Sequence, residues 1–190
     1  MATYKEIHGV KVQYRDSDAT AIEGDVWYNA STGKLKMYSA VGAWASGTAI
    51  NTGRAGGVGQ GTTTAALFEG GGPADTESWD GSSWTEVANL NTARAENSGA
   101  GTQTAALFFG GKPSPGYTEI WNGASWTEVA DLTTGRFTQA GFGITTAAMC
   151  VGGEVSDAVS AIAETFDGSS WTEGADLNTA RVLSLIHISE

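Results

Sequence analysis

The sequence predicts an all-β protein built from repeated four-stranded units, on three observations. Glycine accounts for 27 of the 190 residues, about twice the usual share, and helices tolerate that much glycine poorly. An Asn-Thr-x-Arg tetrad recurs with its arginines 40, 42 and 45 residues apart, which is the length of one blade of a β-propeller. An Asp-Gly or Asn-Gly pair, a strong hairpin signal, separates short β-like runs in each repeat.

The repeats are defined by positions whose spacing is constant. The tetrads occupy residues 51–54, 91–94, 133–136 (slightly altered) and 178–181, and each arginine follows a tryptophan by ten residues. The second glycine of a Gly-Gly pair follows each of the first three arginines by seventeen residues. We interpret these constant positions as structural. They are Gly70, Gly71, Trp84, Arg94, Gly110, Gly111, Trp126, Arg136, Gly152, Gly153, Trp171 and Arg181.

All variation in length falls between the Gly-Gly pair and the next repeat tryptophan, an interval of 13, 15 and 18 residues in successive copies. Loops tolerate length change and often carry recognition on a rigid scaffold. We therefore expect any ligand-binding face in residues 72–75, 112–117 and 154–163. The candidate ligand-binding residues are Asp75, Lys112, Ser114, Tyr117, Glu154 and Asp157.

Four strands are expected in each repeat, as the first copy illustrates. A glycine-rich stretch follows Arg54, a turn covers residues 61–63, and an apolar strand covers residues 64–68. Residues 76–79 and 82–87 then flank Asp80-Gly81, for which we predict a type I′ turn with positive φ at both central residues. Such a unit can bury its faces only against neighbouring units.

The order of apolar run, Gly-Gly, aromatic residue, tryptophan and arginine resembles the kelch repeat over about residues 44–181. The resemblance implies one propeller blade per repeat, with close backbone packing at the glycine pair and the tryptophan wedged between blades. We expect residues 51–182 to hold three blades, at about 54–93, 94–135 and 136–180. Three blades are fewer than the usual minimum of four, so we expect an incomplete propeller, an open arc.

Residues 1–50 differ from the repeats in their sequence pattern. Alternating polar and apolar runs at 24–29 and 34–38 predict a β-hairpin. In the second run, Leu35 and Met37 are expected on the buried face, opposite Lys34 and Lys36. One interpretation is an irregular first blade completed by Trp44. The other is a separate module, because the same segment resembles one found in bacteriophage tail-fibre proteins, notably those of marine phages.

The last eight residues, 183–190, fit nothing in the repeat. They resemble the translation of a sequencing-library adapter, and we expect them to be an artefact with no part in the fold.

Charge and composition exclude several functions. The net charge is −11 and the basic residues are scattered singly, so no nucleic-acid partner is expected. No apolar run is long enough for a membrane span, and the N-terminus lacks the apolar core of a signal peptide. Cys150, the one cysteine, is expected to be buried and inert. We expect no cofactor and no metal site, because His8 has no evident partner and Cys/His ligand spacing is absent.

Acidic residues leave glycosidase chemistry open, although residues 78–84 match the Asp-box of sialidases only partly and are expected to form a tight turn. The arginine of each repeat and the glutamate of each Trp-Thr-Glu could form a ligand-binding ring or blade-to-blade pairs. We favour packing. The glutamates concerned are Glu86, Glu128 and Glu173.

The function expected is that of a non-enzymatic binding and structural protein. The phage resemblance implies a virion tail-associated protein, made in the host cytoplasm, whose loops contact a host-surface glycan or protein and which has other virion proteins as partners. Two alternatives stay open. One is a propeller glycoside hydrolase acting on host polysaccharide, and the other is a bacterial kelch-type protein-interaction module.

Overall fold

The computed structural model describes residues 13–15, 26–37, 46–113 and 116–182. Within these residues every regular element is a strand, which confirms the all-β prediction, and none of them forms a helix able to cross a membrane. The chain divides into two compact units, residues 1–47 and 48–190. The predictions for His8, Trp44, Ser114 and residues 183–190 lie outside the described residues.

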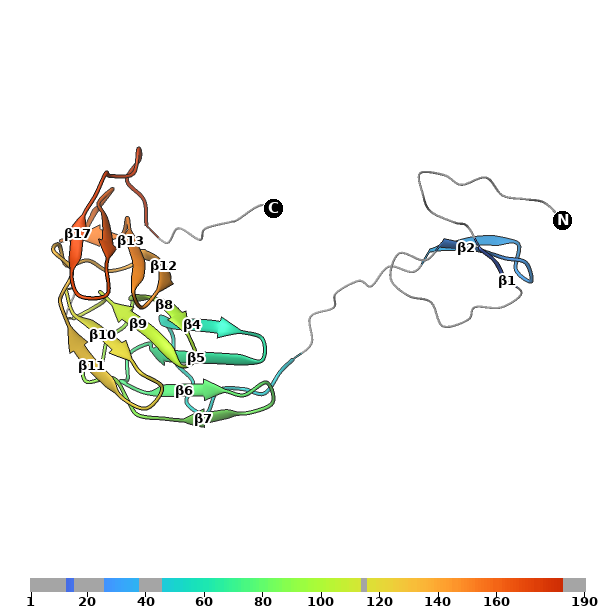
Figure 1. Ribbon diagram of the computed structural model, residues 1–190, viewed down its shortest axis with the longest axis horizontal. Helices are drawn as coiled ribbons and strands as arrows, with labels where there is room; N and C mark the ends of the chain where they lie inside the picture. Colours follow the sequence, from blue (N-terminus) through green and yellow to red (C-terminus); the bar gives the residue numbers. More distant parts are fainter. Residues whose placement is uncertain (1–12, 16–25, 38–45, 114–115, 183–190) are drawn as a thin grey trace. The chain divides into compact units, whose positions relative to one another are not determined.

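The larger unit contains three four-stranded antiparallel sheets, each assembled from consecutive hairpins of one repeat (Figure 1). We call them blades 1, 2 and 3. Blade 1 consists of β4 (Gly57–Thr62), β5 (Ala65–Gly70), β6 (Thr76–Trp79) and β7 (Trp84–Glu86). Blade 2 consists of β8 (Ser98–Thr102), β9 (Ala105–Phe109), β10 (Thr118–Trp121) and β11 (Trp126–Val129). Blade 3 consists of β12 (Ala140–Ile144), β13 (Ala147–Val151), β16 (Ala163–Phe166) and β17 (Trp171–Glu173).

The blades adjoin through their first strands, since β8 lies beside both β4 and β12. The long interval of blade 3 adds a two-stranded hairpin of its own, β14 (Glu154–Val155) and β15 (Ala158–Val159). The order of strands and their pairing agree with the sequence expectation of an incomplete propeller, and the predicted turn at 61–63 becomes a hairpin turn at Thr63 and Thr64.

Hydrophobic cores lie between successive blades. We call the face of a blade that meets the preceding blade its leading face, and the opposite face its trailing face. The core between blades 1 and 2 joins Leu67 and Leu90 to Ala106, Phe108, Trp121 and Trp126 of the second leading face. The core between blades 2 and 3 joins Ala100, Leu107, Phe109 and Leu132 to Ala148, Cys150, Phe166 and Trp171. Burial of apolar area at these junctions stabilises the array.

The repeat tryptophans occupy the junctions, as the kelch resemblance implies. Trp126 Nε1 donates a hydrogen bond to Thr76 Oγ1 of blade 1, and Trp171 Nε1 donates to Thr118 Oγ1 of blade 2, both at 3.1 Å. Both tryptophans are buried, whereas Trp84 of blade 1 is only half-buried. Each buried ring therefore adds a polar link to the apolar contact between blades.

The Asp-Gly and Asn-Gly hairpins form, but the predicted type I′ turn is wrong. Only the glycine has positive φ, +95° at Gly81, and the loop spans four residues between the paired Trp79 and Trp84. The Asp80 carboxylate accepts the backbone N–H groups of Ser82 and Ser83, both at 2.8 Å. Because the side chain satisfies these donors, a second positive φ is not required.

The other two hairpins repeat this arrangement through Asn122 and Asp167. Hydrogen bonds from Ser169 and Ser170 lower the pKa of Asp167 to about 2, and those from Ser83 and Ser82 lower the pKa of Asp80 further. The segment that partly matches the Asp-box therefore forms a hairpin turn stabilised by the Asp80 carboxylate.

In the smaller unit, the predicted hairpin forms from β2 (Val26–Asn29) and β3 (Lys34–Met37), and β1 (Gln13–Arg15) pairs parallel to β2. The predicted burial of Leu35 is wrong, because its side chain is 66% exposed. Trp27 and Asn29 of the neighbouring strand are buried instead. Alternation alone cannot say which face of a hairpin meets a core.

Candidate functional site

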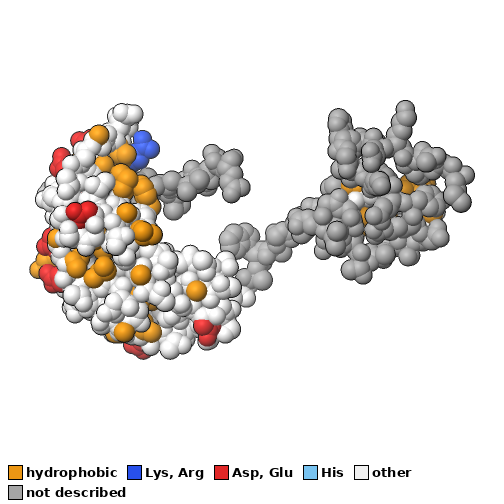
Figure 2. Space-filling view, in the orientation of Figure 1, with side chains coloured by type: hydrophobic (Ala, Val, Ile, Leu, Met, Phe, Trp, Pro, Cys, Tyr) orange, Lys and Arg blue, Asp and Glu red, His pale blue; other side chains and the backbone are white. Residues whose placement is uncertain are grey.

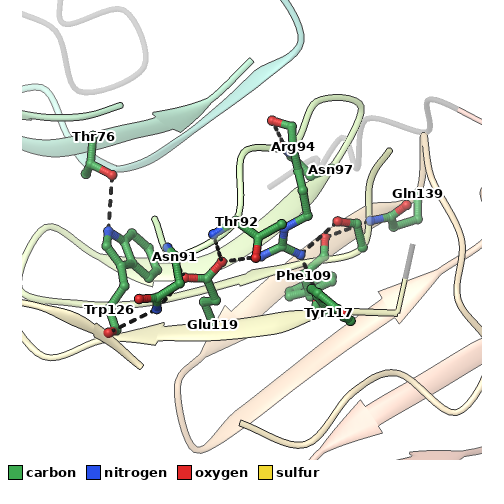
Figure 3. Close-up of polar contacts among 11 residues, drawn as sticks. Thr76, Asn91, Thr92, Arg94, Asn97, Phe109, Tyr117, Glu119, Trp126 and Gln139 are labelled. Atoms are coloured by element: carbon green, nitrogen blue, oxygen red, sulfur yellow. Dashed lines mark hydrogen bonds and ion pairs between the residues drawn. The ribbon is translucent and has the colours of Figure 1, made fainter. Parts of the chain in front are cut away.

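The repeated arginine sits inside a hydrogen-bonded cluster within its own blade (Figure 3). In blade 2, Arg94 Nη2 lies 2.8 Å from Glu119 Oε1, and its guanidinium stacks 4.7 Å above the centre of the Phe108 ring. The same carboxylate accepts the backbone N–H of Asn91 at 2.7 Å and that of Thr92 at 3.3 Å. Burial lowers the pKa of Arg94, and Glu119 opposes that shift.

Blades 1 and 3 repeat the cluster, with Arg54 3.2 Å from Glu77 and Arg136 3.0 Å from Glu164. The glutamates that the sequence offered as partners are therefore the wrong ones. Those of the Trp-Thr-Glu motifs are exposed on the outer strands: Glu86, Glu128 and Glu173. Glu128 pairs across from Glu119 but lies one strand farther from the arginine.

A signal for the true partner exists in the sequence. The buried glutamate precedes each repeat tryptophan by seven residues, as Glu119 precedes Trp126. It lies within the interval of variable length, so counting forward from the arginine does not find it. Because both members of each pair are buried and bonded to each other within the blade, the pairs hold the blade together and present nothing to a ligand.

Two candidate ligand residues, Lys112 and Glu154, belong to one group of neighbouring residues. Lys112 and Ala95 exchange two backbone hydrogen bonds, and Glu154 and Phe137 do the same one blade later. Lys112 Nζ lies 3.6 Å above the centre of the Phe137 ring. The two candidates thus occupy equivalent places, directly after the glycine pairs of blades 2 and 3.

Glu96 and Thr138 complete this group. Lys112 Nζ lies 3.2 Å from Glu96 Oε2, with side chains 49% and 44% exposed. Thr138 donates its backbone N–H to the Glu96 carbonyl at 2.7 Å, and its hydroxyl lies 3.4 Å from Glu154 Oε1. We call Glu96, Lys112, Phe137, Thr138 and Glu154 the loop cluster.

The backbone of the loop cluster is held in an unusual conformation. Glu96 and Thr138 have φ of 58° and 54°, in the left-handed region that few non-glycine residues occupy. The equivalent residue of blade 1 is Gly56, which also has positive φ. Such strained positions concentrate at functional sites. No sequence pattern in the repeat predicts the positive φ of Glu96 and Thr138.

The remaining candidates lie elsewhere. Asp75 and Tyr117 stand at equivalent positions before the third strand, where the carbonyl of each accepts a glycine N–H. Asp75 also lies 3.9 Å from Arg54 and accepts from Asn89, whereas the Tyr117 ring is exposed. Asp157 has positive φ in the turn between β14 and β15. Among the described residues, no hydrogen bond or ion pair joins these three to the loop cluster.

Two buried titratable groups are out of reach of a ligand. Arg136 Nε lies 3.2 Å from Cys150 Sγ, and burial raises the pKa of that thiol to about 11. Burial also raises the pKa of Glu69 to about 8, against a hydrogen bond from Gln60. The described residues contain no group of three or more His, Cys, Asp or Glu able to hold a metal ion.

On the face shown in Figure 2, described acidic side chains are scattered, and Lys and Arg side chains appear at one place only. This face therefore carries no patch of uniform charge. The loop cluster is distinguished instead by its mixed charges, its aromatic ring and its positive φ values.

Comparison with known proteins supports the fold. No family model and no curated protein matches the chain. The solved structure titled "Structure of YjhT" is similar at 15% sequence identity and a TM-score of 0.56, over 70% of this chain and 54% of that one. The chain thus spans about half the length of that structure. With three consecutive four-stranded antiparallel sheets, this likeness assigns residues 48–182 a β-propeller-like fold.

Proposed function

We propose that the three-bladed unit is a non-enzymatic binding module that contacts a host-surface glycan or protein through the loop cluster. One observation carries the proposal. Two of the segments that vary in length between repeats begin at Lys112 and Glu154, and both residues belong to the cluster. The constant charged residues are instead buried in pairs such as Arg94–Glu119.

The chemistry of the cluster suits a polyhydroxylated or peptide ligand. Lys112 is a donor, Glu96 and Glu154 are acceptors, and Thr138 can act as either. Lys112 and Glu96 are each about half exposed, so both can exchange their mutual ion pair for contacts to a ligand. Tyr117 lies close to Lys112 in the sequence, and its exposed ring offers an apolar face on which a sugar ring can stack.

At a finer level, we propose that the protein is virion tail-associated, with other virion proteins as partners. The support is the resemblance of residues 24–38 to phage tail-fibre segments. Mass spectrometry of purified phage particles encoding this chain should detect its peptides in the particle, and their absence from intact virions would remove this part of the proposal.

The binding proposal is tested on an array of bacterial surface polysaccharides probed with the 190-residue protein. The variant Lys112→Ala/Glu154→Ala should bind at least tenfold more weakly. Glu173→Ala, an exposed carboxylate on the outer strand of blade 3, is the matched control and should bind as the parent does. Equal binding by the double variant would contradict the role of the loop cluster.

A hydrolase is the second candidate, because the loop cluster contains two glutamates, of which Glu96 meets Thr138 through its backbone carbonyl and Glu154 through its carboxylate. In that case Glu96→Gln and Glu154→Gln should each abolish release of reducing ends from a bound polysaccharide while leaving binding intact. No release of reducing ends by the parent protein would eliminate this alternative.

A further inference from the structure

Blade 1 exposes the face that blades 2 and 3 bury. The leading face of blade 2 is buried, and so is that of blade 3. In blade 1 the equivalent side chains are all only half-buried. They are Ala66, Phe68, Trp79 and Trp84. Phe68, Trp79 and Trp84 already make the same ring contacts as their counterparts, with Trp79 and Trp84 5.3 Å apart and Trp121 and Trp126 5.4 Å apart. The face is therefore preformed for a junction.

Blade 3 exposes the opposite half of such a junction. Its Phe142 stands where blade 2 has Ala100, and it is 38% exposed while Ala100 is 4% exposed. Ile144 on the same strand is 54% exposed, and Met149 is half-buried where its counterpart Leu107 is fully buried. This trailing face is more apolar on its first strand than the trailing faces already in use.

We propose that these two faces bind each other between two copies of this chain, with the leading face of blade 1 in one copy on the trailing face of blade 3 in the other. The contact would continue the junctions seen between blades 1 and 2 and between blades 2 and 3. Because the two faces differ, the interface is head-to-tail, and two such interfaces close a symmetric pair. The ring then contains six four-stranded sheets, within the range of known propellers.

One polar link of the junction also has an equivalent, although Ala163 stands where Thr76 and Thr118 accept the tryptophan N–H. Inside the chain, Gly71 and Gly111 donate their N–H groups to the carbonyls of Arg94 and Arg136 in the following blade. Gly153 makes this bond to Arg181, whose side chain is exposed and has no carboxylate partner among the described residues.

In the pair, the second copy's tetrad, Asn51 to Arg54, takes the place that residues 178–181 hold in one copy alone. Arg54 keeps its own partner Glu77 and offers its carbonyl to Gly153. The displaced tetrad loses two backbone bonds, from Gly153 to Arg181 and from Arg181 to Ser160, and the first is remade by the second copy. Burial of the aromatic face then favours association.

The test measures the mass of the 190-residue protein by light scattering and sedimentation over a range of concentrations. We expect twice the mass of one chain. The variant Phe142→Asp/Ile144→Asp changes only exposed side chains and should weaken association at least tenfold. Val159→Asp, exposed on the separate β14–β15 hairpin, is the control and should stay paired.

Mixing distinguishes a head-to-tail contact from a symmetric one. Trp84→Ala, on the leading face of blade 1, should also be monomeric, and its folding is to be checked by circular dichroism. An equal mixture of the two monomeric variants retains one intact junction, so pairs should reappear. A parent that stays monomeric at 100 µM, species larger than pairs, or a mixture that remains monomeric would each overturn the proposal. A monomeric parent would leave both faces to a sheet of another protein.

Discussion

The glycine pairs show how single residues fix the approach of two blades. A Cβ on Gly110 would lie 2.7 Å from the Arg136 carbonyl oxygen of the next blade, and one on Gly111 would lie 2.6 Å from the Ala95 oxygen of its own blade. Both glycines also have positive φ, 69° and 93°. The close backbone approach that the kelch resemblance implied is thus a direct steric requirement.

Gly110→Ala should therefore destabilise the protein by about 3 kcal/mol, since backbone strain adds to the clash with the Arg136 carbonyl. Urea unfolding measures the change. Gly72→Ala is the control, because φ there is 111° but a Cβ would meet nothing within 4 Å. It should cost about 1 kcal/mol, the strain alone. Equal losses for the two variants would mean that the close approach is unimportant.

Glu69 is a single-residue departure from the repeat. Blades 2 and 3 have Phe109 and Val151 at its position, and Glu69 is fully buried with one carboxylate oxygen lacking a partner. Burial raises its pKa to about 8, while Gln60 and Arg54 lower it. The folded state thus prefers the protonated acid, whereas the unfolded chain ionises near its ordinary pKa of 4.5.

The contribution of Glu69 to the free energy of unfolding should be most favourable below about pH 4.5. It should fall by a few kcal/mol as pH rises towards about 8 and stay constant above that value. Glu69→Gln should flatten the profile across this window, as followed by thermal melting at several pH values. Glu128→Gln, exposed, is the control and should leave it unchanged. A profile of the parent that rises from pH 5 to pH 8 would contradict the assignment.

At the scale of elements, the tetrad before each blade is tied to the third strand of that blade. Asn91, Thr92 and Arg94 all bind the Glu119 carboxylate, which lies on β10. The segment that connects one blade to the next is therefore anchored to the blade it enters. Arg94 also donates to the carbonyl oxygens of Gly110 and Tyr117, so the guanidinium links the tetrad to both ends of the variable loop.

Glu119→Ala should destabilise the protein by about 3–5 kcal/mol, because it leaves the buried Arg94 charge without its carboxylate partner. Glu128→Ala, on the neighbouring strand of the same blade, should stay within about 0.5 kcal/mol of the parent. Denaturant unfolding of both variants provides the comparison, and similar losses would restore the sequence-based choice of the Trp-Thr-Glu glutamate.

Elements were predictable where local chemistry decides them. The apolar strand before Gly70 and the hairpin at Asp80-Gly81 form as expected, since pattern and turn residues act over a few positions. The turn type was not predictable, because the Asp80 carboxylate replaces a backbone requirement with a side-chain one. The arginine partner was missed because Glu119 lies within the interval of variable length, and its burial beside Arg94 depends on how the strands pair.

At the scale of the whole molecule, the three blades follow one another in chain order, and each contacts its neighbours. Phe109 of blade 2 meets Trp171 of blade 3 with ring centres 4.9 Å apart, and its carbonyl accepts from Gln139 at 2.9 Å. Stability of such arrays is close to a sum of blade and junction contributions. Weakening one junction should release one end of the array first.

Phe109→Ala should cost about 3–5 kcal/mol at the second junction. Hydrogen exchange should then quicken in blade 3 more than in blade 1, because blade 3 has only this junction to hold it within the chain. Val159→Ala, exposed on the β15 hairpin, is the control and should leave exchange unchanged. Uniform acceleration in all three blades would indicate a single cooperative unit instead.

The sequence by itself determined the period, the four strands of each repeat, the glycine pairs and the loops that vary, because each depends on spacing or on residues a few positions apart. Tertiary structure decided that Glu77, Glu119 and Glu164 neutralise the arginines of the three blades, that Lys112 and Glu154 meet Glu96 and Thr138, and that blades 1 and 3 each leave apolar side chains partly exposed. Those facts depend on contacts between residues that lie in different strands or in different blades, and the positions that the repeats share carry no information about which copies are covered and which are left open.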